Sequence, residues 1–331
     1  MPDGTQNGDG GDQGSNYGSG GQAYSLTWGP LTVASGVEDT QCIWLQLPND
    51  APIKVHGLHD VLSTASHHLI VYKDDMDATE QTTPTPCQPF TGALNTSGKI
   101  MPLAITQKHD DEILLPDGVA YTLAAHQMIK LEMHYINASD QDAQAQATVN
   151  FETADASTIH DEAGLMFTGS PDINIPASGQ ATLHEFFTVP STFDLSQSHI
   201  FAITGHEHKM GTGVTVKVGT SKDDPAMTTV YNPDPFMWAE PLTQTFDPPF
   251  SVATGGGFDF TCSWTNTSTA KIKFGESAND EMCFFWAYYW PAQGAEGSRV
   301  CIHTNQYNGA NGGYDACCPG DAVCSLIESQ F

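Results

Sequence analysis

Short runs in which apolar and polar residues alternate recur along this chain from about residue 25, for example over 41–47, 148–151 and 213–218. Because successive side chains of a β-strand point to opposite faces, this alternation predicts strands with one buried face. The chain has 20 prolines and 31 glycines, which punctuate the runs, and it shows no long helical periodicity. We therefore predict an all-β fold built from two jelly-roll-like antiparallel β-sandwich domains.

The composition changes at two places along the chain. Residues 1–23 are mostly Gly, Asp, Gln, Asn and Ser, and such a segment cannot bury enough apolar surface to offset its ordering entropy. We expect a disordered tether there. A polar stretch at 152–157 interrupts the β pattern, so we predict an N-terminal sandwich over 24–154 and a C-terminal sandwich with a cysteine-rich tail over 155–331.

The charge balance excludes one class of partner. The chain has 39 Asp and Glu but 11 Lys and Arg, a formal net charge of −28. A surface this acidic repels phosphate backbones, so we do not expect nucleic acid as a partner. No apolar run reaches the ~20 residues that a transmembrane helix needs.

The cysteines indicate an oxidising compartment. The chain has eight cysteines, and none forms a C-x-x-C pair, which favours disulfide bonds over a zinc cluster. We therefore expect a secreted, periplasmic or cell-surface protein. The sequence opens Met1-Pro2-Asp3 without an apolar signal segment, so we expect that an export signal has been removed. The tether would then have joined the folded part to a removed N-terminal membrane anchor.

Six potential metal ligands fall into two groups. The three-histidine set is His67, His68 and His134, and the histidine–methionine set is His206, His208 and Met282. A soft thioether beside imidazoles favours Cu(I), whereas an all-imidazole group accepts copper or zinc. The two sets predict two copper sites of different character, which suggests redox chemistry.

The spacing within each set makes a geometric demand. His206 and His208 at i and i+2 of a predicted strand would share one face, about 6.6–6.8 Å apart. His67 and His68 are neighbours, so both can reach one ion only at a bulge or a twisted edge. Each motif alone is equally typical of ordinary buried or exposed histidines, and Met282 precedes aromatic residues typical of a core.

Four phrases together are more specific than any one of them. SHHLIVYK (66–73), KLEMHYIN (130–137), ITGHEHKMG (203–211) and NDEMCFFWAYYWP (279–291) occur in this order. They resemble the copper type II, ascorbate-dependent monooxygenases, the family of peptidylglycine α-hydroxylating monooxygenase and dopamine β-monooxygenase. The resemblance covers roughly 40–291, and the tether composition favours a bacterial exported member.

This resemblance implies an enzyme that hydroxylates an aliphatic C–H bond of a small molecule with O2. It implies two copper ions per chain, with ascorbate or another one-electron reductant as co-substrate. The three-histidine set would hold the electron-transfer copper. The histidine–methionine set would hold the catalytic, oxygen-binding copper.

The resemblance also implies two disulfide bonds, Cys42–Cys87 and Cys262–Cys283. The tail cysteines, Cys301, Cys317, Cys318 and Cys324, lie outside the matching region. Vicinal Cys317 and Cys318 are poorly placed to bond each other, because their Cα atoms are only ~3.8 Å apart. Cys301 and Cys324 should therefore take one each, and which takes which stays open.

The chain departs from the peptide-amidating members at substrate positions. Thr204 stands where those enzymes have an Arg that binds the peptide carboxylate, and Phe284 and Trp286 replace an Asn and a Tyr. Without the Arg the bidentate carboxylate contact is absent, so we predict a substrate other than a C-terminal glycine peptide. Phe284 and Trp286 indicate an apolar pocket, or else two core aromatics. Glu132 replaces a Gln, which leaves electron transfer through that position open.

Two other functions remain open at this stage. A non-catalytic exported copper-binding or scavenging protein could keep the ligands without a substrate pocket. A structural zinc protein is the other, and Met282 argues against it because zinc rarely binds a thioether.

Overall fold

The computed structural model describes residues 22–76, 79–87, 99–275, 277–294, 297–305, 313–319, 321 and 324. Strands dominate these residues; η1 (Ala156–Thr158) is a short 3-10 helix, and Cys324 is the other described residue in a helical conformation outside it. The all-β prediction is therefore confirmed. Most of the predicted tether, residues 1–21, lies outside the described residues, and the first strand begins at Ala23. No helix within the described residues is long and apolar enough to cross a membrane.

The first half of the chain, which we take as residues 22–162, contains two sheets. Its strands are β1 (Ala23–Val33), β2 (Glu38–Gln46), β3 (Ile53–Leu62), β4 (Ser66–Asp74), β5 (Gln81–Pro86), β6 (Ile100–Thr106), β7 (Asp110–Leu114), β8 (Val119–Leu123), β9 (Met128–Ile136), β10 (Ala143–Ala154) and β11 (Asp161–Glu162). One sheet has the order β1-β10-β3-β8-β11 with β7 beside β3, and the other has the order β5-β2-β9-β4-β6. Buried side chains of both sheets, such as Phe151 and Leu131, form one apolar cluster. The first half is thus a β-sandwich.

Strand β9 is buried along nearly its whole length. Leu131, Met133 and Tyr135 contribute to the sandwich core. The alternate residues Glu132 and His134 therefore face the outer side of the sheet, because strand side chains alternate. A polar side chain on this outer face is buried only because other parts of the molecule cover it.

The chain passes to the second half later than the predicted boundary at 154/155. Residues 155–158 form a turn in which Asp155 accepts a hydrogen bond from the backbone N–H of Ser157. Strand β11 then pairs parallel with β8, so it still belongs to the first sheet. The passage occurs at Ala163, directly before the first strand of the second half.

The second half, residues 163–324, is also built from sheets. Its strands are β12 (Gly164–Gly169), β13 (Asn174–Ile175), β14 (Gln180–Thr188), β15 (His199–His206), β16 (Gly211–Gly219), β17 (Thr228–Tyr231), β18 (Thr243–Phe250), β19 (Gly257–Thr265), β20 (Ile272–Lys273), β21 (Phe284–Trp290), β22 (Arg299–Thr304) and β23 (Tyr314–Cys318). They form a six-stranded sheet β18-β15-β21-β12-β22-β23, a four-stranded sheet β14-β19-β16-β17 and the pair β13-β20.

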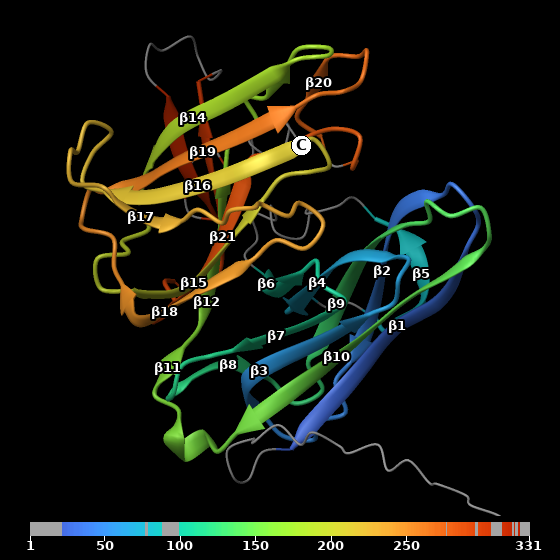
Figure 1. Ribbon diagram of the computed structural model, residues 1–331. Helices are drawn as coiled ribbons and strands as arrows, with labels where there is room; N and C mark the ends of the chain where they lie inside the picture. The colour runs from blue at the N-terminus through green and yellow to red at the C-terminus, as the bar shows by residue number, and fades with distance from the viewer. Residues whose placement is uncertain are drawn as a thin grey trace, which may run out of the picture.

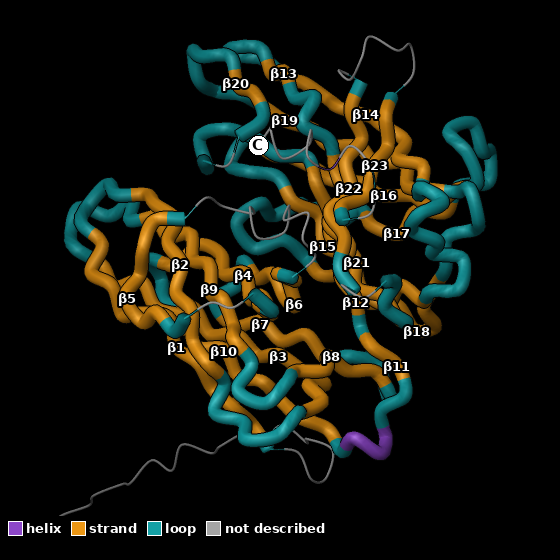
Figure 2. Tube along the Cα trace, turned by 180° about the vertical axis from the view of Figure 1, so that it is seen from behind, coloured by secondary structure: helices purple, strands orange, loops and turns teal. Residues whose placement is uncertain are grey.

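The central strand β21 divides its side chains between two cores. Phe285 and Tyr289 pack in the core of the second half, whereas Phe284, Trp286 and Tyr288 belong to the same apolar cluster as the core of the first half. The six-stranded sheet therefore lies between the four-stranded sheet and the first half. Figures 1 and 2 show β4 and β6 at this junction.

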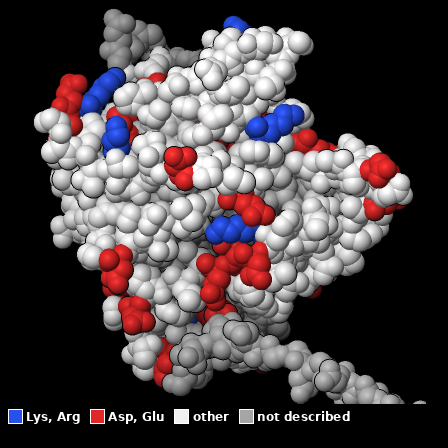
Figure 3. Space-filling model, in the orientation of Figure 1, with Lys and Arg blue, Asp and Glu red and all other residues white. Residues whose placement is uncertain are grey.

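All eight cysteines form disulfide bonds: Cys42–Cys87, Cys262–Cys283, Cys301–Cys317 and Cys318–Cys324. Vicinal residues of β23 point to opposite faces, so each of its two cysteines has its own partner. Four disulfide bonds fit an oxidising environment. Acidic side chains are spread over both halves of the face drawn in Figure 3, with few basic ones between them.

A histidine clamp ties the two sheets of the second half together. Nδ1 of His303 on β22 lies 2.7 Å from Oδ1 of Asp315 on β23, and Nε2 lies 3.1 Å from Oε2 of Glu185 on β14. Burial lowers the pKa of His303, but the hydrogen bonds to Asp315 and Glu185 outweigh it and raise the pKa to about 9. At neutral pH His303 is therefore a buried cation between two carboxylates.

Candidate metal centre

The three-histidine set comes together on β4 and β9. His68 and His134 are opposite each other in the antiparallel pairing, and the register shifts between Ser66 and His68. This bulge, which the adjacent pair required, lets His67 turn towards its neighbour. The ligand nitrogens of the three imidazoles all lie within 4.8 Å of one another.

The distances within the three-histidine set fit a shared ion. Nδ1 of His67 and Nδ1 of His68 are 3.4 Å apart. Two imidazole nitrogens bound to one ion at ~2.0–2.1 Å, with an angle between tetrahedral and trigonal, lie about 3.3–3.6 Å apart. Nε2 of His67 is buried and has no hydrogen-bond partner in the described part of the chain. An ion shared through the two Nδ1 atoms would leave this Nε2 as an N–H donor, so the fit rests on the distances between the ligand nitrogens.

Burial keeps the imidazoles of His67 and His68 neutral. It lowers the pKa of His67 to about 3, with further contributions from His134 and His208. It also holds the pKa of His68 well below its usual range. Neutral imidazole is the form that binds metal ions, so at neutral pH both rings are ready to act as ligands.

The histidine–methionine set forms where β15 meets β21. His206 is the last residue of β15 and pairs with Phe284 at the start of β21. We expected both histidines at i and i+2 of one strand. Instead, His208 lies in the turn beyond the strand. Their ring centroids are nevertheless 5.1 Å apart and the rings are perpendicular, at 88°. Met282 precedes β21 by two residues, and all three side chains are buried.

Hydrogen bonds fix the orientation of both imidazoles in this set. Nδ1 of His206 lies 2.8 Å from Oε1 of Gln107, and Nδ1 of His208 lies 3.2 Å from the carbonyl oxygen of Asp280. A ring nitrogen that faces a carbonyl oxygen donates its N–H, so the lone pair of each ring is on Nε2. Burial holds the pKa of His206 well below its usual range and lowers that of His208 to about 4.

A buried carboxylate positions the turn that carries His208. Glu281 accepts hydrogen bonds from the backbone N–H of His208 at 2.9 Å, the backbone N–H of Met210 at 2.7 Å and the indole of Trp264 at 3.0 Å. Burial raises its pKa to about 7. Because Glu281 precedes Met282 directly, one segment supplies both the thioether and the acceptor that orders the histidine turn.

Two contacts cross between the halves at these sets, and a third contact, within the first half, holds a ligand. The Trp238 ring, from the segment between β17 and β18, stacks on His67 with centroids 5.6 Å apart. Gln107, which follows β6, contacts His206 as described above. Oε1 of Glu38 lies 3.2 Å from Nε2 of His134, and this hydrogen bond holds the pKa of Glu38 at about 2. The sequence analysis missed all three residues, because no local pattern marks them.

The predicted substrate positions are buried. Thr204, Phe284 and Trp286 are each 2% exposed or less. Phe284 stacks on Phe167 at 4.7 Å between centroids, and Trp286 lies 5.8 Å from the His206 ring. In this conformation the two aromatics are part of the apolar cluster at the junction of the halves, beside the histidine–methionine set.

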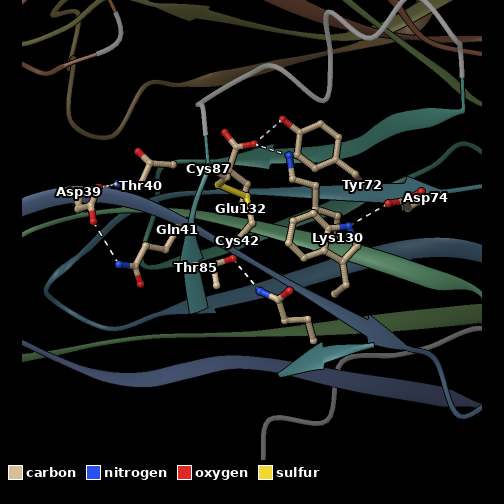
Figure 4. The surroundings of a disulfide bond; sticks show 12 residues. Asp39, Thr40, Gln41, Cys42, Tyr72, Asp74, Thr85, Cys87, Lys130 and Glu132 are labelled. Carbon is tan, nitrogen blue, oxygen red and sulfur yellow. Dashed lines mark hydrogen bonds and ion pairs between the residues drawn. A yellow bond between two sulfur atoms is a disulfide. The ribbon is translucent and has the colours of Figure 1, made fainter. Parts of the chain in front are cut away.

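Glu132 is engaged in a buried ion pair. Its Oε2 lies 3.1 Å from Nζ of Lys130 and accepts a hydrogen bond from the Tyr72 hydroxyl at 3.1 Å. Figure 4 shows these three side chains pointing towards one another beside the Cys42–Cys87 disulfide. Because both cysteines are oxidised, this cluster is not a metal site. It instead fills the outer face of β9 next to His134.

Comparisons with known proteins give one family. Residues 161–310 match the copper type II ascorbate-dependent monooxygenase C-terminal domain. No curated protein matches the chain.

Among solved structures, that of Sulfolobus turreted icosahedral virus shares 10% identity with a TM-score of 0.21, covering 78% of this chain and 58% of that one. Infectious bursal disease virus strain Gx shares 10% identity with a TM-score of 0.19, covering 84% and 72%. These likenesses are too weak to support an argument. The matched region contains the histidine–methionine set, and residues 161–310 of the chain belong to the C-terminal domain family of the copper type II ascorbate-dependent monooxygenases.

Proposed function

We propose that this protein is a two-copper monooxygenase that hydroxylates an aliphatic C–H bond of a small organic substrate, with O2 and an external reductant such as ascorbate. The observation that carries the proposal is the pair of unequal ligand sets. One consists of three imidazoles within 4.8 Å of one another. The other combines two imidazoles with a buried thioether. It lies within residues 161–310, whose family match names copper and ascorbate.

The two ligand sets differ in the chemistry that they support. Copper at the histidine–methionine set would meet O2 there, with the thioether favouring the reduced ion, and copper at the three-histidine set would supply the second electron. The chain's own part is positioning. Gln107 and the Asp280 carbonyl each hold Nδ1 of one histidine, so that Nε2 of each ring carries the lone pair for the ion. The buried surroundings keep water away.

The substrate that we propose is apolar and is not a C-terminal glycine peptide. Thr204 donates to or accepts from Thr243, with their oxygens 2.9 Å apart, and cannot form the forked contact that an Arg makes with a carboxylate. Phe284 and Trp286 would contact an apolar or aromatic substrate once the junction admits it. Productive turnover of a glycine-extended peptide would count against this assignment.

We propose that the protein works outside the reducing cytosol, in a secreted, periplasmic or cell-surface setting. Its four disulfide bonds support this. The polar segment 1–23 would tether the folded part to an N-terminal anchor. Retention of the protein at the cell surface, and its release by proteolytic cleavage within 1–23, would test the tether.

The test is copper stoichiometry with X-ray absorption of the reduced protein, comparing wild type, Met282→Ala and the control Met166→Ala. Met166 is also fully buried but lies in the core of the second half. We expect two copper ions per chain and a copper–sulfur contribution that Met282→Ala alone removes. One ion, or a sulfur contribution that persists in Met282→Ala, would refute the site assignment.

A non-catalytic copper-binding protein is the second candidate, and one observation favours it. Phe284 and Trp286 are packed into the core in this conformation, as they would be in a protein that has no substrate pocket. Ascorbate-dependent O2 consumption that rises when a C–H substrate is added, with formation of a hydroxylated product, would decide for the enzyme. Copper binding without any such product would decide for the scavenger.

A further inference from the structure

Glu38, at the start of β2, contacts groups that serve both ligand sets. Its carboxylate lies 3.2 Å from Nε2 of His134 in the first half. It also accepts hydrogen bonds from Ser277 Oγ at 3.2 Å, Ala278 N at 3.0 Å and Asn279 Nδ2 at 3.4 Å in the second half. One carboxylate thus joins a ligand of the three-histidine set to the turn 277–279.

The turn 277–279 leads directly into the residues of the other set. The next residue, Asp280, orients His208 through its carbonyl oxygen, and Met282 follows two residues later. Glu38 therefore fixes His134 directly and the histidine–methionine set through one turn of backbone. The positions of the ligands in the two sets are therefore linked by the single side chain of Glu38.

Charge gives this link a second consequence. Neutral imidazoles are the form that binds metal ions and a thioether is uncharged, so neither ligand set supplies negative charge to a bound copper ion. The two sets lie on either side of this carboxylate, which contacts His134 of one set and the turn 277–279 that leads to Met282 of the other. Two cations close together repel, more strongly in a buried site than in water. A carboxylate bonded towards both sides offsets that repulsion.

Two other carboxylates at the second set, those of Glu207 and Glu281, accept the hydrogen bonds described for them within one half. Glu207 accepts hydrogen bonds from the backbone N–H groups of Gly213 and Ser263, and Glu281 accepts from His208, Met210 and Trp264. The partners of both acids lie in the second half. Glu38 instead reaches the second half from the first, with 24% of its side chain exposed.

We infer that Glu38 is the shared positioning residue and counter-charge of the two copper sites, so that an ion at one site does not weaken binding at the other. This inference rests on the proposed function only in that both sets bind copper. If it holds, the copper affinities of the two sets are thermodynamically linked, and each set affects the other to the same extent.

The experiment measures that linkage with Cu(I) alone as the probe. The affinity of the histidine–methionine set is determined by competition with a chromophoric chelator under anaerobic conditions. It is measured in the intact chain after the three-histidine set is filled, and again with His68→Ala, which breaks that set. The ratio of the two affinities is the coupling.

We expect a ratio near one in the wild type. In Glu38→Gln the filled neighbour should weaken binding by about 5- to 150-fold, the usual range for coupled sites. Asp39→Asn is the matched control, because Asp39 is the neighbouring acid and accepts hydrogen bonds from Gln41 and Tyr135. Its ratio should stay at the wild-type value.

Two outcomes would overturn the inference. A Glu38→Gln ratio equal to that of the wild type shows that the carboxylate does not couple the sites, since a purely structural loss weakens both affinities and leaves the ratio unchanged. A ratio in Glu38→Asp as far from one as the ratio in Glu38→Gln shows that the negative charge is not the cause of the coupling. By contrast, a wild type that binds two ions but hydroxylates nothing refutes the proposed function and leaves this inference standing.

Discussion

Removing the Glu281 carboxylate tests how the protein holds the turn that carries His208. Glu281→Ala leaves three buried donors without their acceptor: the backbone N–H groups of His208 and Met210 and the indole N–H of Trp264. Each buried donor left unsatisfied costs about 1–3 kcal/mol. Water entering the space recovers part of this, so we expect the free energy of unfolding to fall by about 3 kcal/mol or more.

The matched control is Asp224→Ala. Asp224 also accepts three hydrogen bonds, two from Thr220 and one from Ala226, but it is partly exposed, in the connection between β16 and β17. Water replaces the lost acceptor there, so this variant should lose far less stability. Urea denaturation of both variants gives the comparison, and copper affinity of the histidine–methionine set should fall only in Glu281→Ala. Equal losses of stability in the two variants would refute the reasoning from burial.

Three further predictions concern the groups around the sets. Lys130→Met strips the buried Glu132 of its ion pair and should cost about 3–5 kcal/mol in urea denaturation, most of which Lys130→Met with Glu132→Leu should recover; a double variant as unstable as the single one would contradict this. The pKa of His303 is about 9 in the folded protein against about 6.5 when unfolded. Its ion pairs therefore stabilise the protein fully below pH 6.5 or so and cease to do so as the pH rises through about 9. The difference in melting temperature between wild type and His303→Gln should therefore shrink as the pH rises from about 6 to about 10. A difference that grows over this range would contradict the prediction. Because Trp238 stacks on His67, filling the three-histidine set with Cu(II) should quench its fluorescence; Trp238→Phe should lose that part of the quenching, and unchanged quenching would place the ion elsewhere.

Local patterns in the sequence were enough to predict the strands and part of the geometry at the ligands. Alternation predicts strands because it reports which face of each strand is buried, and adjacent His67 and His68 demand a bulge that the register between β4 and β9 contains. The H-x-H spacing was less informative. His206 ends its strand and His208 lies in a turn held by Glu281, so the perpendicular rings arise from a hydrogen-bonded turn and not from strand periodicity.

The boundary near residue 154 shows a different limit of sequence reasoning. The polar stretch 152–157 does mark the end of β10 and the turn η1. Composition cannot reveal that Asp161 and Glu162 then pair with β8, because a two-residue parallel strand has no periodicity of its own. The face of the strand that carries the predicted pocket residues could not be predicted either, because β21 is buried on both sides and shows no alternation. Phe284 and Trp286 face the first half only because β21 lies between two cores.

The residues that connect the two ligand sets could not be predicted from spacing at all. Gln107 is separated from His206 by 99 positions, and Glu38 from Ser277 by 239. Their contacts depend on how the apolar side of β21 packs on the first half, since that packing sets where the end of β6 meets His206 and where the start of β2 meets the turn 277–279. Trp238 crosses in the opposite direction, from the second half onto His67. Each set is therefore oriented in part by the half that does not supply it. It follows that the apolar junction, although it contains no ligand, determines the geometry of both sets, and a change in its packing should disturb them together.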